Sequence, residues 1–355
     1  MIPGNFHPLI RNSIRALLIL ALVFALLQWS AFPVVAAYQF DLVGPAGSGQ
    51  FGYSVTALPN GNLVVTDPFY DKGANADVGA VYLYHGVTHA LISTLTGSTV
   101  NDNVGLGGVK VLTNGNYVIQ SPLWNNGSAA MAGAATWGSM TTGVSGVVSS
   151  DNSLVGSTAG DQVGMFVTAL TNGNYVVSSP FWDAPGPVAD VGAATWVNGL
   201  TGLPKGAISN SISLVGSTAD DWVGGVSALT NGNYVVKSPY WDGVTTNTGA
   251  ATWVNGASGL PKGAVQSSNS LVGSKIDDMV GITATPLTNG NYVVNSYYWD
   301  GAATNTGAAT WVNGATGNPK GAVSSDNSLV GSTASDQVGA WSIPLTNGNY
   351  VVCSP

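Results

Sequence analysis

The chain has 355 residues, a formal net charge of −8, 17 aspartates, no glutamate and a single cysteine, Cys353. One cysteine excludes an intramolecular disulfide. A strongly acidic chain with only nine basic residues lacks the positive surface that holds nucleic acid or anionic lipid. The absence of glutamate, with abundant Gly, Thr, Val and Asn, favours strands and turns over helices.

The first 37 residues have the pattern of an export signal. Arg11 and Arg15 precede an apolar run over residues 16–27, and the small residues Val35, Ala36 and Ala37 follow it. This run is shorter than the roughly 20 residues that span a bilayer, which disfavours the alternative of an uncleaved anchor. We expect cleavage after Ala37, a secreted or cell-surface location, and no membrane span in the mature chain.

The tripeptide Asn-Gly-Asn occurs six times in the remaining chain, beginning at Asn60, Asn114, Asn172, Asn231, Asn289 and Asn347. A fixed period of this length indicates a repeat architecture. The copies cover residues 38–94, 95–152, 153–212, 213–269 and 270–327, with a partial copy at 328–355. Features present in every copy are expected to be structural, and function is expected where the copies differ.

Each copy predicts four antiparallel strands. In the first, the segments Phe51–Leu58, Leu63–Asp67, Val78–Tyr84 and Ala90–Leu95 carry strand-type apolar patterns. Asn-Gly between the first two indicates a tight primed hairpin turn with positive φ at both central residues. Tandem four-stranded units of about 58 residues predict an all-β protein, a β-propeller with one blade per copy. An open array of β-sandwich modules is the alternative, although about 58 residues is small for a sandwich.

The strand count predicts an incomplete propeller. Residues 38–43 match the segment that ends each copy, and they would form a fourth strand without its first three. Five full blades follow, and the chain ends with only a first and a second strand, at 338–345 and 349–355. The total expected is 23 strands, with a gap or a poorly closed seam in the ring.

The first copy resembles the FG-GAP repeat of the integrin α-subunit propeller, through Phe51-Gly52, Asp67-Pro68 and the strand Val78–Tyr84. The variant Leu-Thr-Asn-Gly-Asn-Tyr-Val-Val is similar to repeats of unassigned function in bacterial exported adhesins of the filamentous-haemagglutinin type. FG-GAP blades often bind calcium through an Asp-rich loop, but the turn here is short and carries only Asn on each side of Gly. Calcium prefers six to eight oxygen ligands, so the resemblance implies no calcium site in this chain.

Aspartate recurs in two series. One lies in the motif Asp-x-Val-Gly, and its members are Asp102, Asp161, Asp221, Asp278 and Asp336. The other follows a recurring tryptophan, with Asp183, Asp242 and Asp300 in the later copies and Asp71 and Asn125 in the first two. These carboxylates would either form a ring of ligand sites on one rim or accept backbone N–H groups and fix turns. Their strict periodicity favours turn fixing.

Tryptophan also recurs in two series, of which the second is Trp137, Trp196, Trp253 and Trp311. Such large flat side chains would pack between blades or stack on a sugar. Adjacent strand residues face opposite sides, so in pairs such as Tyr240-Trp241 one ring would be exposed. The candidate ligand-binding residues are therefore Trp124, Trp182, Trp241, Trp299, Asp183, Asp242 and Asp300.

No motif indicates an enzyme. His85 and His89 lack the Glu of a zinc-binding His-Glu-x-x-His helix, and no nucleophile elbow or phosphate loop occurs. We expect no metal, no cofactor and no catalysis. The first hypothesis is an exported adhesion or scaffold module at a bacterial surface, with a protein or glycan partner; the alternative is a lectin-like carbohydrate-binding propeller. A specific site is expected in the variable loops, such as residues 72–77, 125–131 and 184–190.

Overall fold

The computed structural model describes residues 39–186 and 188–355, and it shows an all-β chain built from one kind of sheet. These residues contain no helix, as the composition predicts, and therefore none that could cross a membrane. The chain divides into two units, Met1–Val43 and Gly44–Pro355, and every described strand belongs to the second. The export signal expected at residues 1–37 lies outside the described residues.

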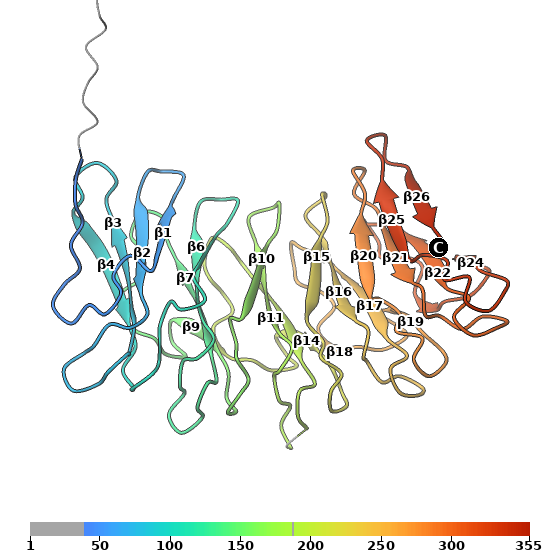
Figure 1. Cartoon of the computed structure of the whole chain (residues 1–355), viewed down its shortest axis with the longest axis horizontal. Coiled ribbons are helices and arrows are strands. Elements are labelled where there is room, and N and C mark those ends of the chain that lie inside the picture. The colour runs from blue at the N-terminus through green and yellow to red at the C-terminus, as the bar shows by residue number, and fades with distance from the viewer. Residues whose placement is uncertain (1–38, 187) are drawn as a thin grey trace, which may run out of the picture. The chain divides into compact units, whose positions relative to one another are not determined.

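Five sheets and a final hairpin follow one another along the chain (Figure 1). Sheet 1 contains β1 (Ser54–Ala57), β2 (Leu63–Asp67), β3 (Ala80–Tyr84), β4 (Leu91–Thr96) and β8 (Gly146–Val147). Sheet 2 contains β5 (Val109–Val111), β6 (Tyr117–Ser121), β7 (Ala134–Gly138), β9 (Ser153–Val155) and β13 (Gly206–Ala207). Sheet 3 contains β10 (Phe166–Ala169), β11 (Tyr175–Ser179), β12 (Ala193–Val197), β14 (Ser213–Val215) and β18 (Gly263–Ala264). Sheet 4 contains β15 (Gly225–Ala228), β16 (Tyr234–Ser238), β17 (Ala250–Val254), β19 (Leu271–Val272) and β23 (Gly321–Ala322). Sheet 5 contains β20 (Thr283–Pro286), β21 (Tyr292–Ser296), β22 (Ala308–Val312) and β24 (Leu329–Val330), and the terminal hairpin consists of β25 (Trp341–Pro344) and β26 (Tyr350–Cys353).

The Asn-Gly-Asn motif makes the hairpin between the first two strands of every sheet. In sheet 3 the backbone N–H of Leu170 donates to the carbonyl oxygen of Asn174 at 2.8 Å, and the Oδ1 atom of Asn172 accepts from the N–H of Asn174 at 3.1 Å. Positive φ occurs at Gly173 (90°) but not at Asn172. The expected hairpin is therefore confirmed, but the two-residue primed turn is wrong, because an asparagine side chain closes a longer turn instead.

A fifth, short strand joins most sheets from the following repeat. Gly206 and Ala207 of β13 pair in parallel with Leu154 and Val155 of β9, which is the outer strand of the preceding sheet. Strands β8, β18 and β23 do the same for sheets 1, 3 and 4. Each repeat thus covers the open edge of its predecessor. The sequence patterns did not predict these strands, because two residues show no period.

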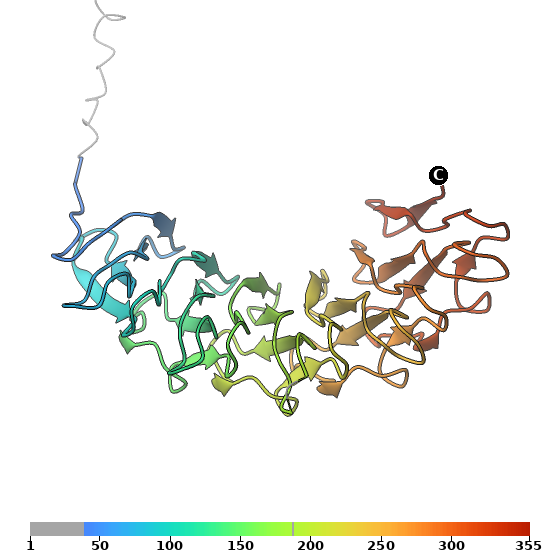
Figure 2. The same cartoon turned by 60° about the horizontal axis from the view of Figure 1, so that its bottom comes forward.

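The hydrophobic core is a series of interfaces between successive sheets, which the two views in Figures 1 and 2 show in chain order. Between sheets 3 and 4, for example, Leu170, Val176 and Leu214 pack with Tyr234 and Trp241. The last interface is the smallest: only Leu287, Val293 and Ala309 of sheet 5 are buried there. Burial at each junction makes neighbouring repeats depend on one another, as in other repeat proteins.

The count of five complete four-stranded sets and one terminal hairpin is confirmed. The total of 23 strands is wrong: residues 39–43 form no strand, and four short fifth strands bring the total to 26 in the described residues. Strand pairing within residues 39–186 and 188–355 does not join sheet 1 to the terminal hairpin, so no closed ring of sheets is formed by them. The propeller geometry itself stays a prediction.

Candidate functional site

The tryptophans of the first series lie inside the protein. Trp124, Trp182, Trp241 and Trp299 are only 2–7% exposed and belong to the cores between sheets. The indole N–H groups of these four residues have no hydrogen-bond partner. Their role as sugar-binding residues stays a prediction, which these buried positions do not favour.

The aspartates that follow these tryptophans hold loops in place. The Oδ1 atoms of Asp183, Asp242 and Asp300 accept backbone N–H groups at 2.8, 2.7 and 2.6 Å. The donors are Asp190, Asn247 and Asn305, each with positive φ near 50°. A short carboxylate that accepts such an N–H fixes a turn. Ligand binding by these aspartates likewise stays a prediction, and the turn-fixing alternative accounts for their periodicity.

Each aspartate of the Asp-x-Val-Gly motif accepts at least two backbone N–H groups. The Oδ2 atom of Asp161 accepts the N–H groups of Ser157 and Thr158 at 2.8 Å, and its Oδ1 atom accepts that of Asp183 at 3.0 Å. Burial raises the pKa of Asp161, whereas backbone hydrogen bonds lower the pKa of the exposed Asp336. No cluster of potential metal ligands occurs among the described residues.

A ladder of side-chain amides joins each repeat to the next. The Oδ1 atom of Asn174 accepts the N–H of Gly199 in its own repeat at 3.0 Å, and its Nδ2 atom donates to the carbonyl oxygen of Gly256 in the next at 2.9 Å. The carbonyl oxygen of Gly256 also accepts from the side-chain amide of Asn172 at 2.9 Å and from the indole N–H of Trp196 at 2.8 Å. The second tryptophan series and the Asn-Gly-Asn turns therefore connect sheets.

The fourth residue of the second strand differs from sheet to sheet. In sheet 2, the side chain of Gln120 donates to the carbonyl oxygens of Gly164 and Met165 at 3.1 and 3.0 Å, and in sheet 5 Asn295 accepts from Ser342 at 2.6 Å. The equivalent residues of sheets 3 and 4 are Ser178 and Lys237. Serine is too short to reach across, and the structure gives Lys237 no ion pair within the described residues.

The segment that leads into the first strand of sheet 4 is also one residue shorter than in sheets 3 and 5. Strand β10 begins two residues after Gly164 and β20 two residues after Gly281, but β15 begins directly after Gly224, one residue fewer. The strand then starts with Gly225, where sheet 3 has Phe166. A groove of about 460 Å³ lies at this place, and Gly224, Gly225 and Lys237 are among the residues that line it.

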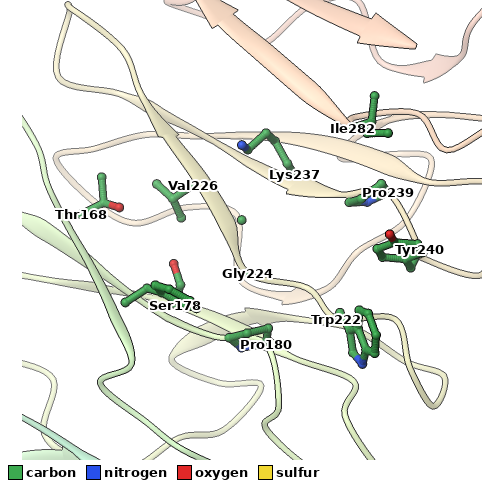
Figure 3. A pocket seen from close by; sticks show the side chains of 12 residues that line it. Thr168, Ser178, Pro180, Trp222, Gly224, Val226, Lys237, Pro239, Tyr240 and Ile282 are labelled. Carbon is green, nitrogen blue, oxygen red and sulfur yellow. The ribbon is translucent and has the colours of Figure 1, made fainter. Parts of the chain in front are cut away.

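The groove crosses the first strand of sheet 4 (Figure 3). Thr168 and Ser178 lie toward one end, Trp222 and Tyr240 lie at the other, and Lys237 lies between them. The rings of Trp222 and Tyr240 make an edge-to-face pair with centroids 5.2 Å apart, and the two side chains are 41% and 39% exposed. Apolar walls with a few convergent polar groups are typical of a ligand site.

A second hollow, of about 490 Å³, involves the loop Asn125–Met131. The expectation of a specific site in the variable loops stays a prediction. The walls of this hollow combine polar residues such as Thr99 and Asn101 with apolar ones such as Leu123, and no aromatic ring is among them. The groove at sheet 4 is therefore the stronger candidate site.

None of the seven predicted binding residues lines the groove. Tyr240 was singled out only as the neighbour of Trp241, and the expectation that one ring of the pair is exposed is met. Trp222 was missed. Its signal was available: it stands in the motif Asp-x-Val-Gly, where the other copies have Asn103, Gln162, Met279 and Gln337.

Comparisons with known proteins identify the repeat but no activity. One solved structure, the extracellular domain of a proposed one-component system from B. thetaiotaomicron, aligns with a TM-score of 0.32 and 10% identity. The alignment covers 88% of this chain and only 34% of the other. No curated protein sequence matches this chain. The repeat of unknown function DUF5650 matches five times in tandem, at residues 57–106, 111–165, 169–225, 228–282 and 286–340, and the chain therefore belongs to the DUF5650 repeat family.

Proposed function

We propose that this protein is an exported, non-enzymatic interaction scaffold at a bacterial surface, built on FG-GAP-like blades of an open propeller. The observation that carries the proposal is the amide ladder. It fixes successive repeats in register through uncharged side chains, as in the bond from Asn174 to Gly256, and leaves the loops and the groove free to vary. A rigid repeat array with variable surface features suits binding better than catalysis.

The export signal supports the surface location, because it would deliver the acidic repeat domain outside the cell. The test is fractionation of producing cells, followed by binding of the purified repeat domain to envelope material and to a panel of glycans and matrix proteins. Saturable binding by protein from the extracellular or surface fraction supports the proposal. Cytosolic retention, or turnover of a substrate in a broad hydrolase screen, contradicts it.

Carbohydrate binding is the second candidate, and the groove favours it. The exposed rings of Trp222 and Tyr240 offer apolar faces at one end of the groove, and the hydroxyl groups of Thr168 and Ser178 lie toward the other end. Sugars present apolar C–H faces and hydroxyl groups together, and aromatic rings with nearby polar groups match that pattern. A glycan array separates this candidate from a scaffold that binds only proteins.

A further inference from the structure

We infer that the groove at sheet 4 binds an acidic saccharide, such as a chain of uronic acids, through the ammonium group of Lys237 and the rings of Trp222 and Tyr240. This inference rests on the proposed surface function and names the ligand class of one site. The groove is not a repeated feature, so it is a place where a binding function distinguishes one repeat from the others.

Lys237 supplies the charge. Its side chain is half-buried on β16, and no ion pair to it occurs in the described residues. None of the 12 residues that line the groove is acidic, although the chain as a whole carries 17 aspartates and a net charge of −8. Burial lowers the pKa of Lys237. A half-buried cation without a partner lowers stability, and an anionic ligand would compensate for the lost hydration.

Trp222 supplies an unusual apolar surface. Its backbone has φ of 47°, in the left-handed region that bulky residues disfavour. The equivalent positions share this φ but mostly carry Asn or Gln, as at Asn103, Gln162 and Gln337. The tryptophan is 41% exposed, and among the described rings it pairs with that of Tyr240. Its exposed part is an apolar surface on which the ring of a ligand would stack.

Gly225 keeps the groove open. A Cβ atom placed on it would lie 3.2 Å from the carbonyl oxygen of Lys237 and 3.5 Å from its Cε atom, and the backbone there has no positive φ. A larger residue would require the backbone to shift by a few tenths of an ångström, and sheet 3 carries Phe166 at this position. The glycine allows a ligand to reach Lys237 from the side of Ser178.

The chemistry separates acidic from neutral sugars. A uronic acid carboxylate would accept hydrogen bonds from the Lys237 ammonium, while the apolar face of its ring lies against Trp222 or Tyr240. The hydroxyl groups of Thr168 and Ser178 would meet ring hydroxyls farther along the groove. A neutral sugar could use the rings and hydroxyls but not the charge.

The test is calorimetric titration of the purified repeat domain with oligogalacturonate and with a neutral galactose oligomer of equal length. We expect binding of oligogalacturonate at least tenfold tighter than of the neutral oligomer. Lys237→Met should remove this preference. Gly225→Phe, which copies sheet 3, and Trp222→Gln, which copies Gln162, should each weaken binding at least tenfold. Trp311→Gln and Lys320→Met are matched controls, because both side chains are exposed away from the groove.

Circular dichroism and melting curves confirm that each variant folds. Equal affinity for the two oligomers, binding unchanged by Gly225→Phe, or no binding of either at millimolar concentration would overturn the inference. If the unaltered protein binds envelope material but does not bind oligogalacturonate, the scaffold function stands and the ligand assignment falls. Loss of envelope binding in the unaltered protein would instead remove the proposed function itself.

Discussion

The side-chain amide of Asn174 donates to the carbonyl oxygen of Gly256, 82 residues farther along the chain, at 2.9 Å. Through its Oδ1 atom the same side chain holds the N–H of Gly199 within its own repeat. One residue therefore fixes a turn and joins two sheets. The bond gives the second asparagine of Asn-Gly-Asn a role in joining successive repeats as well as in the turn.

Asn174→Ala should lower the free energy of unfolding by about 1–3 kcal/mol, because it leaves polar backbone groups at Gly199 and Gly256 without these partners. Asn349→Ala is the matched control. It occupies the same place in the terminal hairpin, where its side chain makes no bond to another repeat within the described residues. Urea denaturation followed by tryptophan fluorescence gives both values. Equal losses in the two variants would show that the ladder does not stabilise the junctions.

Removal of divalent metal should leave the melting temperature unchanged. The carboxylate oxygens of Asp161 already accept three backbone N–H groups, so they are not free to ligate calcium. Melting curves with and without EDTA test this. Asp161→Ala should lower the melting temperature equally in both conditions, since it removes turn contacts and not a metal ligand. A marked fall caused by EDTA in the unaltered protein would contradict the turn-fixing role.

The pH dependence of the free energy of unfolding at alkaline pH should reveal that the half-buried ammonium group of Lys237 destabilises the folded protein. Its pKa is lower in the folded protein than the ordinary 10.5, so near and below pH 10.5 the unfolded chain binds more protons there. Stability from this group therefore rises with pH through that window. Buried tyrosines act in the opposite sense, because burial raises their pKa, for Tyr117 to about 12. The contribution of Lys237 is therefore isolated by comparing the free energy of unfolding of the unaltered protein with that of a variant that lacks this lysine.

The measurement is the free energy of unfolding of the unaltered protein minus that of Lys237→Met, between pH 7 and pH 10. At pH 7 the methionine variant should be the more stable of the two, and the difference should shrink as the pH rises. A difference that is constant across this range, or that grows, would mean that the ammonium group is well hydrated and that no desolvation acts on it.

The export signal expected at residues 1–37, which lies outside the described residues, leads to a further prediction. N-terminal sequencing of secreted material should give a mature start at Tyr38, because the small residues at 35–37 suit signal peptidase. Replacing Val35 and Ala37 with bulky residues should cause the precursor to accumulate. Full-length chain with Met1 in the cytosol of unaltered cells would contradict the assignment.

The repeat pattern predicted the main strands because the same apolar pattern recurs in every copy and is long enough to read in the first, where β1 to β4 have four to six residues. Strands such as β2 (Leu63–Asp67) and the Asn-Gly-Asn hairpins were therefore found within a few residues. The two-residue strand β13 could not be, since its partner Leu154 is 52 residues away and no local pattern marks the pairing. The groove depends on which residue of one repeat faces which residue of the next. Gly225 and Lys237 can be read in the sequence, but only the pairing of β15 with β16 places these two residues opposite each other.

The terminal hairpin should gain stability when further strands cover its exposed apolar side chains. Trp341, Ile343 and Val351 are exposed there, and only three buried residues of sheet 5 form the junction beneath it. Trp311 in sheet 5 is 41% exposed, while the equivalent Trp253 donates to the carbonyl oxygen of Gly314 at 2.8 Å. The corresponding tryptophans of sheets 2, 3 and 4 each donate to a glycine carbonyl oxygen of the next repeat.

A copy of residues 298–330 fused after Pro355 would supply further strands and such a carbonyl oxygen. It contains a third and a fourth strand for β25 and β26, a two-residue strand for the open edge of β24, and a glycine carbonyl equivalent to that of Gly314. The fusion should raise the melting temperature and protect Trp311 from fluorescence quenching by acrylamide. A fusion with the same residues in scrambled order is the control and should change neither. If the ordered and scrambled fusions behave alike, the exposed face of the hairpin does not accept a repeat, and stacking of these sheets depends on more than the contacts described here.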